Sequence, residues 1–183
     1  MVTSVRFSNF KSYQGSTLEL STLTLLVGAN ASGKSNALEG IRLISWLASG
    51  ARLDSIGRKV QAGDTEFRGK VTDLFNDKRK PLDLEVVLSG KNEWNRFHIA
   101  LAFRDGALRI YQEEITSPAQ SFPLYRVERP ATGLSHDIEV VYNNFARGGK
   151  KPHIVANDQL ALFTQLETPA RFDKNHEKAQ QVI

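Results

Sequence analysis

The sequence predicts an α/β fold of α+β character, in which a mixed sheet carries one early helix and continues as an antiparallel β-meander. The short apolar run at residues 23–27 has the composition of a buried parallel strand. Between residues 82 and 115 apolar and polar residues alternate, with connections too short to join parallel strands. Gly50 stands where the early helix would stop, and its expected apolar stripe is Ala37, Leu38, Ile41, Ile44, Leu47 and Ala48.

Local patterns predict the remaining elements. The Asp105-Gly106 pair is a strong hairpin signal inside the meander. Asn157 and Asp158 are suited to cap a helix, which Pro169 would end. In chain order we expect strands around 5–7 and through 18–20, one helical turn near 71–75, strands at 124–128 and 138–142, and a helix over 157–169.

Composition excludes several classes of protein. The chain has 183 residues, a net charge of +4 and 40% hydrophobic residues, which suits one ordinary domain. Because it has no cysteine, disulfide scaffolds, thiolate metal sites and cysteine nucleophiles are excluded. The four histidines lack the spacing of metal ligands, so the sequence predicts no dedicated zinc site. With no run of about eighteen apolar residues and no signal-like N-terminus, we expect a cytoplasmic protein with no membrane partner.

Residues 28–35 have the G-x-x-x-x-G-K-S pattern of a phosphate-binding loop, placed between the predicted strand and helix. Backbone N–H groups after Gly28 would form an anion nest, which the positive end of the helix dipole strengthens. Lys34 would hold the β- and γ-phosphates, and the Ser35 hydroxyl would bind Mg²⁺. The sequence thus predicts a nucleoside triphosphate with Mg²⁺, held by Gly28, Ala29, Asn30, Ala31, Ser32, Gly33, Lys34, Ser35 and Asn36.

The segment ahead of this loop carries a resemblance to a known family. The run Asn-Phe-Lys-Ser-Tyr at 9–13, then an alternating strand and the run at 25–41, resembles the N-terminal head segment of ABC-type ATPases of the SMC and RecF kind. OLD-like and other AAA-type ATPases share this segment. The resemblance is close over residues 1–48 and implies ATP as the nucleotide, with Lys11 and Ser12 beside its phosphates or sugar.

The resemblance also implies an organisation and partners. Residues 1–183 would form a single incomplete head lobe, divided into a strand, phosphate-loop and helix core at 1–50, a loop-rich connection at 51–81, antiparallel strands at 82–156 and a helical tail at 157–183. A glutamine at the junction of the two lobes would reach Mg²⁺ and the attacking water. Gln159 or Gln165 could match it, and position favours Gln159. Heads of this class dimerise over two ATP molecules and act on DNA or an effector nuclease, in DNA repair or anti-phage defence.

Two elements that hydrolysis needs are missing from the sequence. No stretch of four apolar residues ends in Asp-Glu, although an acidic residue at the end of such a strand must hold Mg²⁺. No L-S-x-G-Q-like stretch is present either, and in the family this stretch contacts the ATP of the partner head. Both belong to the C-terminal half of a head. The chain is therefore expected to be the N-terminal portion of a longer or split ATPase, inactive alone.

Two other functions stay open at this point. A complete small P-loop kinase acting on a metabolite would need mobile arginines over the γ-phosphate, and the available ones are Arg104, Arg109, Arg126 and Arg129. A non-catalytic nucleotide-binding regulatory module needs only the phosphate loop. The basic stretches at 78–80 and 147–151 could contact DNA phosphates, and equally could be solvated loops.

Overall fold

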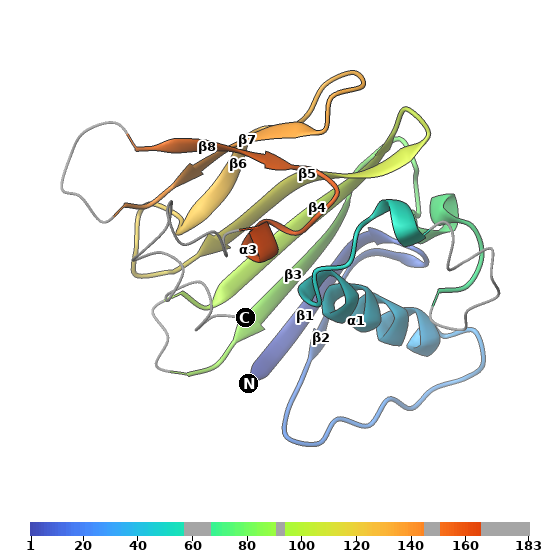
Figure 1. Ribbon diagram of the computed structural model, residues 1–183. Helices are drawn as coiled ribbons and strands as arrows, with labels where there is room; N and C mark the ends of the chain where they lie inside the picture. Colours follow the sequence, from blue (N-terminus) through green and yellow to red (C-terminus); the bar gives the residue numbers. More distant parts are fainter. Residues whose placement is uncertain (57–66, 91–93, 145–150, 166–183) are drawn as a thin grey trace.

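A computed structural model of the chain describes residues 1–56, 67–90, 94–144 and 151–165 (Figure 1). One eight-stranded sheet dominates it, in the order β2-β1-β3-β4-β5-β6-β7-β8, and each pair of neighbouring strands is antiparallel. The elements are β1 Val2–Phe10, β2 Tyr13–Glu19, α1 Lys34–Ala48, the 3₁₀ turn η1 Val71–Leu74, β3 Leu82–Leu88, β4 Arg96–Arg104, β5 Ala107–Thr116, β6 Tyr125–Arg129, β7 Asp137–Tyr142, β8 His153–Asn157 and α3 Leu162–Gln165.

The antiparallel part of the sheet agrees with the sequence prediction. The meander at 82–115 is formed by β3, β4 and β5, and the strands expected at 124–128 and 138–142 are β6 and β7. Asp105 and Gly106 connect β4 to β5 with φ angles of 52° and 78°. Positive φ at both central residues is the conformation that a two-residue hairpin with right-handed strand twist requires, and it explains the Asp-Gly signal.

The predicted mixed sheet is wrong for the described residues. Residues 23–27, expected to be a buried parallel strand, form no strand, and Leu23, Leu25 and Val27 are 86%, 82% and 82% exposed. The physical reason is that, within the described parts of the chain, no strand lies beside this segment to pair with its backbone. An extended segment without a partner leaves its N–H and C=O groups to water and is not a strand.

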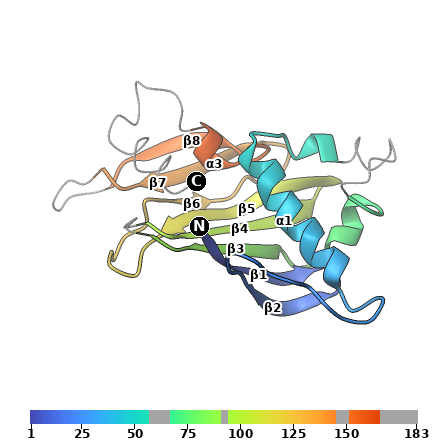
Figure 2. The same ribbon diagram turned by 90° about the horizontal axis from the view of Figure 1, so that it is seen from below.

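Helix α1 packs across one face of the sheet, next to β1 (Figure 2). The contact is close because Gly40 has no side chain: a Cβ there would lie 2.3 Å from Cε1 of the buried Phe7 ring. This contact turns the helix relative to the predicted stripe. Leu38 is 46% exposed and Ile41 is only partly buried, whereas the buried set is Ala37, Glu39, Gly40, Leu43, Trp46 and Leu47. The prediction of the helix is confirmed and its buried face is corrected.

The segment after β8 is held by buried polar side chains. Glu113 on β5 accepts hydrogen bonds from the Leu162 N–H, 2.8 and 2.9 Å from its two oxygens, and from the Tyr125 hydroxyl at 2.8 Å. Asp158 is fully buried and binds His136 and Arg109. The helix predicted over 157–169 therefore begins only at Leu162, because the residues before it turn inward to make these bonds. Residues 166–169 lie outside the described residues.

We expect the buried Glu113 to make stability depend on pH. Burial raises its pKa from 4.5 to about 7, although hydrogen bonds from Leu162 and Tyr125 favour the charged form. A raised pKa in the folded state stabilises the fold fully below pH 4.5, and this contribution is lost as pH rises through about 7. Urea unfolding between these pH values should show a decrease of about 3 kcal/mol from this group. Glu113→Gln should flatten this slope, and an unchanged slope in that variant would contradict the assignment.

Candidate nucleotide-binding site

The loop at 28–33 is wound around the ammonium group of Lys34. Ala31 and Gly33 have φ angles of 64° and 96°, which bend the backbone through the left-handed region twice in three residues. Lys34 Nζ donates to the carbonyl oxygens of Gly28 and Ala29, both at 2.6 Å, and to Ser32 Oγ at 3.2 Å. The cation therefore points into the loop, where a phosphate group could accept its hydrogen bonds in place of these neutral oxygens.

Helix α1 begins immediately after this loop, and its first turn is open to an anion. The N-cap residue Gly33 makes no side-chain capping bond, and the first turn has no acidic residue. The first hydrogen bond of the helix runs from the Ala37 N–H to the Gly33 carbonyl oxygen at 3.0 Å. The N–H groups of Lys34, Ser35 and Asn36 precede it and have no helical acceptor. An anion bound here would satisfy them and meet the positive end of the helix dipole.

The turn between β1 and β2 lies against the same loop. The Tyr13 hydroxyl donates to the Gly33 carbonyl oxygen at 3.1 Å, and Asn36 Nδ2 donates to Ser12 Oγ at 2.8 Å. A Cβ at position 33 would lie 3.0 Å from Tyr13 Oη, and the residue that carries it would also have to keep the positive φ of Gly33. Glycine at this position is therefore required twice, by the backbone angle and by the contact. The structure places Ser12 next to Asn36 in the first turn of α1, and its contact with the nucleotide stays a prediction.

Lys11 lies beside the loop, but its ammonium group binds the buried Glu39. Lys11 Nζ forms an ion pair with one Glu39 oxygen and donates to the Arg68 carbonyl oxygen at 3.0 Å. The Arg68 guanidinium pairs with the other Glu39 oxygen and donates to Asn36 Oδ1 at 3.2 Å. The Glu39 side chain is 3% exposed, so two cations compensate its burial. Contact of Lys11 with the nucleotide stays a prediction.

A hollow of about 350 Å³ opens beside the loop, between β2 and the segment at 25–28. Its volume lies in the range of about 300–1,000 Å³ that small-molecule sites occupy. Its walls include Tyr13, Thr17, Leu18, Leu26, Lys34 and Ala37. The hollow is continuous with the cation at the phosphate loop, so the residues present fit a ligand with an anionic tail and a larger, less polar body.

The structure does not bring the two candidate glutamines to this loop. The Leu53 N–H donates to the Gln159 carbonyl oxygen at 2.9 Å, which places Gln159 beyond the C-terminal end of α1. The 15 residues of α1 span about 22 Å, and Ser35 lies at its other end. The Gln159 side chain is buried and donates to the Leu108 carbonyl oxygen at 3.0 Å. Gln165 binds the backbone of Asn157 and Leu160. The predicted Mg²⁺ contact of either glutamine therefore does not match this structure.

Sequence reasoning missed three residues that shape the site: Tyr13, Glu39 and Arg68. Tyr13 lies inside the run that carried the resemblance, yet its contact with Gly33 depends on the antiparallel return of the chain. Glu39 could have been singled out as a lone carboxylate among apolar helix positions. The sequence around Arg68 does not indicate a role at the site, because only the tertiary structure brings Arg68 to Glu39 and Asn36 of α1.

A phosphate loop that leads into an uncapped helix, with a lysine directed into the loop, has the arrangement of a nucleotide-binding protein. The comparison with known families agrees with this class. The chain belongs to the AAA ATPase domain family, whose model matches residues 1–178, and this membership supports an ATP-binding ATPase function. The comparison with curated proteins found no match, and neither did the comparison with solved structures. Among the described residues, no helix has the length and apolar character needed to cross a bilayer.

Proposed function

We propose that this chain is the ATP-binding N-terminal part of an SMC/RecF/OLD-like ATPase, whose heads dimerise and couple ATP binding and hydrolysis to DNA repair or anti-phage defence in the cytoplasm. The observation that carries the proposal is the Lys34 ammonium group, held inside the loop at the uncapped start of α1. Residues 28–36 would hold the phosphates of ATP, with Lys34 on the β- and γ-phosphates and the Ser35 hydroxyl on Mg²⁺.

A second part of the head would complete this site. The segment at 23–27 supports this view, because Leu23, Leu25 and Val27 are exposed and no described strand pairs with it, so it is suited to join a sheet that another polypeptide segment supplies. The added polypeptide would also supply the missing carboxylate that holds Mg²⁺ and the residue that positions the attacking water. The C-terminal lobe of the same head is the partner that fits both needs.

Turnover tests this proposal. The purified chain should bind ATP with Mg²⁺ in a calorimetric titration and release no phosphate in a steady-state assay. The coding sequence after Ile183 should contain an apolar strand that ends in Asp-Glu, and a protein that includes it should hydrolyse ATP. Hydrolysis by the 183-residue chain alone, or phosphate transfer to a small metabolite, would overturn the incomplete-head proposal.

The arginines argue against the alternative of a small-molecule kinase. Arg109 is buried against Asp158, Arg104 lies over the Tyr111 ring, Arg126 lies over the Phe122 ring and Arg129 pairs with Glu139. These arginines lie on β4, β5 and β6, two or more strands along the sheet from β1, the strand that α1 contacts. A regulatory module would bind ATP equally well, and only the completed protein's turnover separates it from an ATPase head.

DNA as the partner of the head remains part of the proposal. Of the two basic stretches, the one at 78–80 includes Arg79, which pairs with Asp77 at 2.9 Å, and most of the other lies outside the described residues. The pairing lowers the charge that the first stretch offers to a phosphate backbone.

A further inference from the structure

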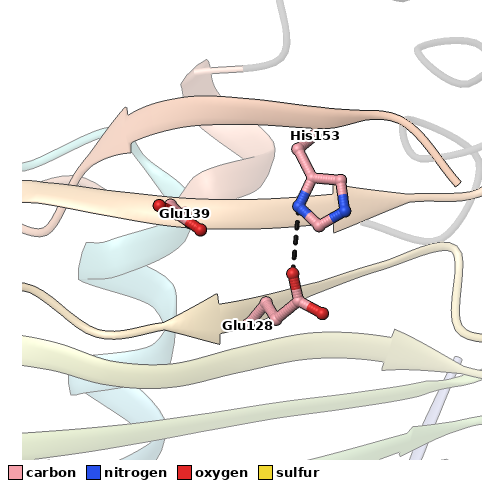
Figure 3. Close-up of side chains that lie close together, drawn as sticks. All are labelled: Glu128, Glu139 and His153. Atoms are coloured by element: carbon pink, nitrogen blue, oxygen red, sulfur yellow. Dashed lines mark ion pairs between the residues drawn. The ribbon is translucent and has the colours of Figure 1, made fainter.

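Three side chains from three neighbouring strands meet at the far end of the sheet (Figure 3). Glu128 comes from β6, Glu139 from β7 and His153 from β8. Side chains alternate between the two faces of a strand, and Ile138 and Val140 on either side of Glu139 are fully buried. The three side chains therefore lie on the face opposite to the core, where solvent reaches them.

The strand register explains why they meet. The pairing of β6 with β7 shifts between Val127 and Arg129, so Glu128 is the extra residue of a β-bulge. A bulge changes the direction of the side chain that it carries, and here it adds Glu128 to the outer face. His153 pairs with Val141, two residues along β7 from Glu139, so its ring lies diagonally across from that carboxylate.

The donor atoms have the chemistry and spacing of a zinc site. One ligand atom from each residue lies within 4.8 Å of the others, and His153 Nδ1 lies 3.0 Å from Glu128 Oε2. In a tetrahedral zinc site with bonds of about 2.0–2.2 Å, neighbouring ligands are roughly 3.3–3.5 Å apart. The side chains of Glu128 and Glu139 are 40% and 45% exposed, so small rotations would close the remaining gap.

We propose that Glu128, Glu139 and His153 bind one Zn²⁺ ion, with a fourth position left to water. Two carboxylates balance the charge of the ion, and an imidazole ligand favours zinc over magnesium or calcium. Counted along the sheet, β7 lies five strand spacings, or about 24 Å, from β1, so the zinc site and the proposed nucleotide site lie on different parts of the sheet. The sequence could not predict it, since the ligands come from three strands.

Replacing Arg129 tests zinc binding at this site more specifically than removing one of the three ligands. Arg129 Nη1 lies 3.3 Å from both oxygens of Glu139, so the guanidinium competes with a metal ion for this carboxylate. The Arg129 side chain is 74% exposed and can withdraw into water when the ion binds. Replacing Arg129 should therefore strengthen zinc binding, an effect that non-specific binding to surface carboxylates would not show.

Calorimetric titration of ZnCl₂ into the metal-free protein, in phosphate-free buffer, tests the site. The wild-type chain should bind one ion, and His153→Ala and Glu128→Gln should each weaken the affinity at least about tenfold. Arg129→Gln should tighten it. Zinc should also raise the melting temperature of the wild-type chain and leave that of His153→Ala unchanged.

His98 is the matched control, because it too lies between two carboxylates, those of Asp83 and Glu114. Circular dichroism should show that each variant is folded. His98→Gln should bind zinc as the wild-type chain does. Loss of binding in His98→Gln, an unchanged affinity in His153→Ala, or no saturable binding by the wild-type chain would each overturn the proposal.

Discussion

Lys34→Ala should abolish detectable ATP binding while the circular dichroism spectrum stays that of the wild-type chain. The Lys34 ammonium is the one cation that the structure directs into the loop at 28–33, as far as the described residues go. A charge-assisted hydrogen bond to phosphate is about twice as strong as a neutral one, and several would be lost together. Isothermal titration calorimetry with ATP and Mg²⁺ measures the effect.

The fold should tolerate this substitution for a reason that the structure gives. The hydrogen bonds of Lys34 reach only atoms of its own loop, and Gly28, Ala29 and Ser32 are exposed. Lys78→Ala, which removes an exposed lysine beyond the loop, is the matched control and should bind ATP normally. Retained affinity in Lys34→Ala would refute the phosphate-loop assignment, whatever the fate of the larger proposal.

Elements whose conformation depends on residues close together in the chain could be predicted from the sequence. The alternation of β3 to β5, the Asp-Gly turn and the G-x-x-x-x-G-K-S loop each lie within a few residues, so local physics fixes them. Residues 23–27 failed as a strand because a parallel strand needs partners far along the chain. The buried face of α1 failed because Gly40 lets the Phe7 ring approach, a contact that helical periodicity does not encode.

The same distinction applies to the candidate site. The residues of the loop were named from a local sequence pattern. The contacts beside the loop could not be named in this way, because they join the end of β1, α1 and the segment at 67–70, which lie far apart in the chain. Gln159 was placed at the magnesium ion by its position in the chain, and the antiparallel strands carry it to the other end of α1 instead. Position along a chain predicts a catalytic contact only when the intervening topology is known.

Glu39→Gln should destabilise the fold by about 3 kcal/mol, because it breaks a buried ion pair. The variant keeps the shape of the side chain and removes its charge. The Lys11 side chain is 10% exposed, so its ammonium would stay buried without a counter-charge. Arg68 is 58% exposed and would turn to water, which limits the loss. Urea unfolding monitored by tryptophan fluorescence measures the change in the free energy of unfolding.

Removing Lys11 as well separates charge from packing. If the unpaired ammonium causes the loss, Lys11→Met in the Glu39→Gln background should recover part of the stability, because an apolar chain then fills the same space. Glu85→Gln is the matched control: it breaks the partly exposed pair with Arg96, and such pairs contribute at most about 1 kcal/mol. A loss in Glu39→Gln no larger than in Glu85→Gln would mean that the buried carboxylate does not hold the β1–β2 turn against α1. The turn's contacts with Gly33 and Asn36 would then have to position it by themselves.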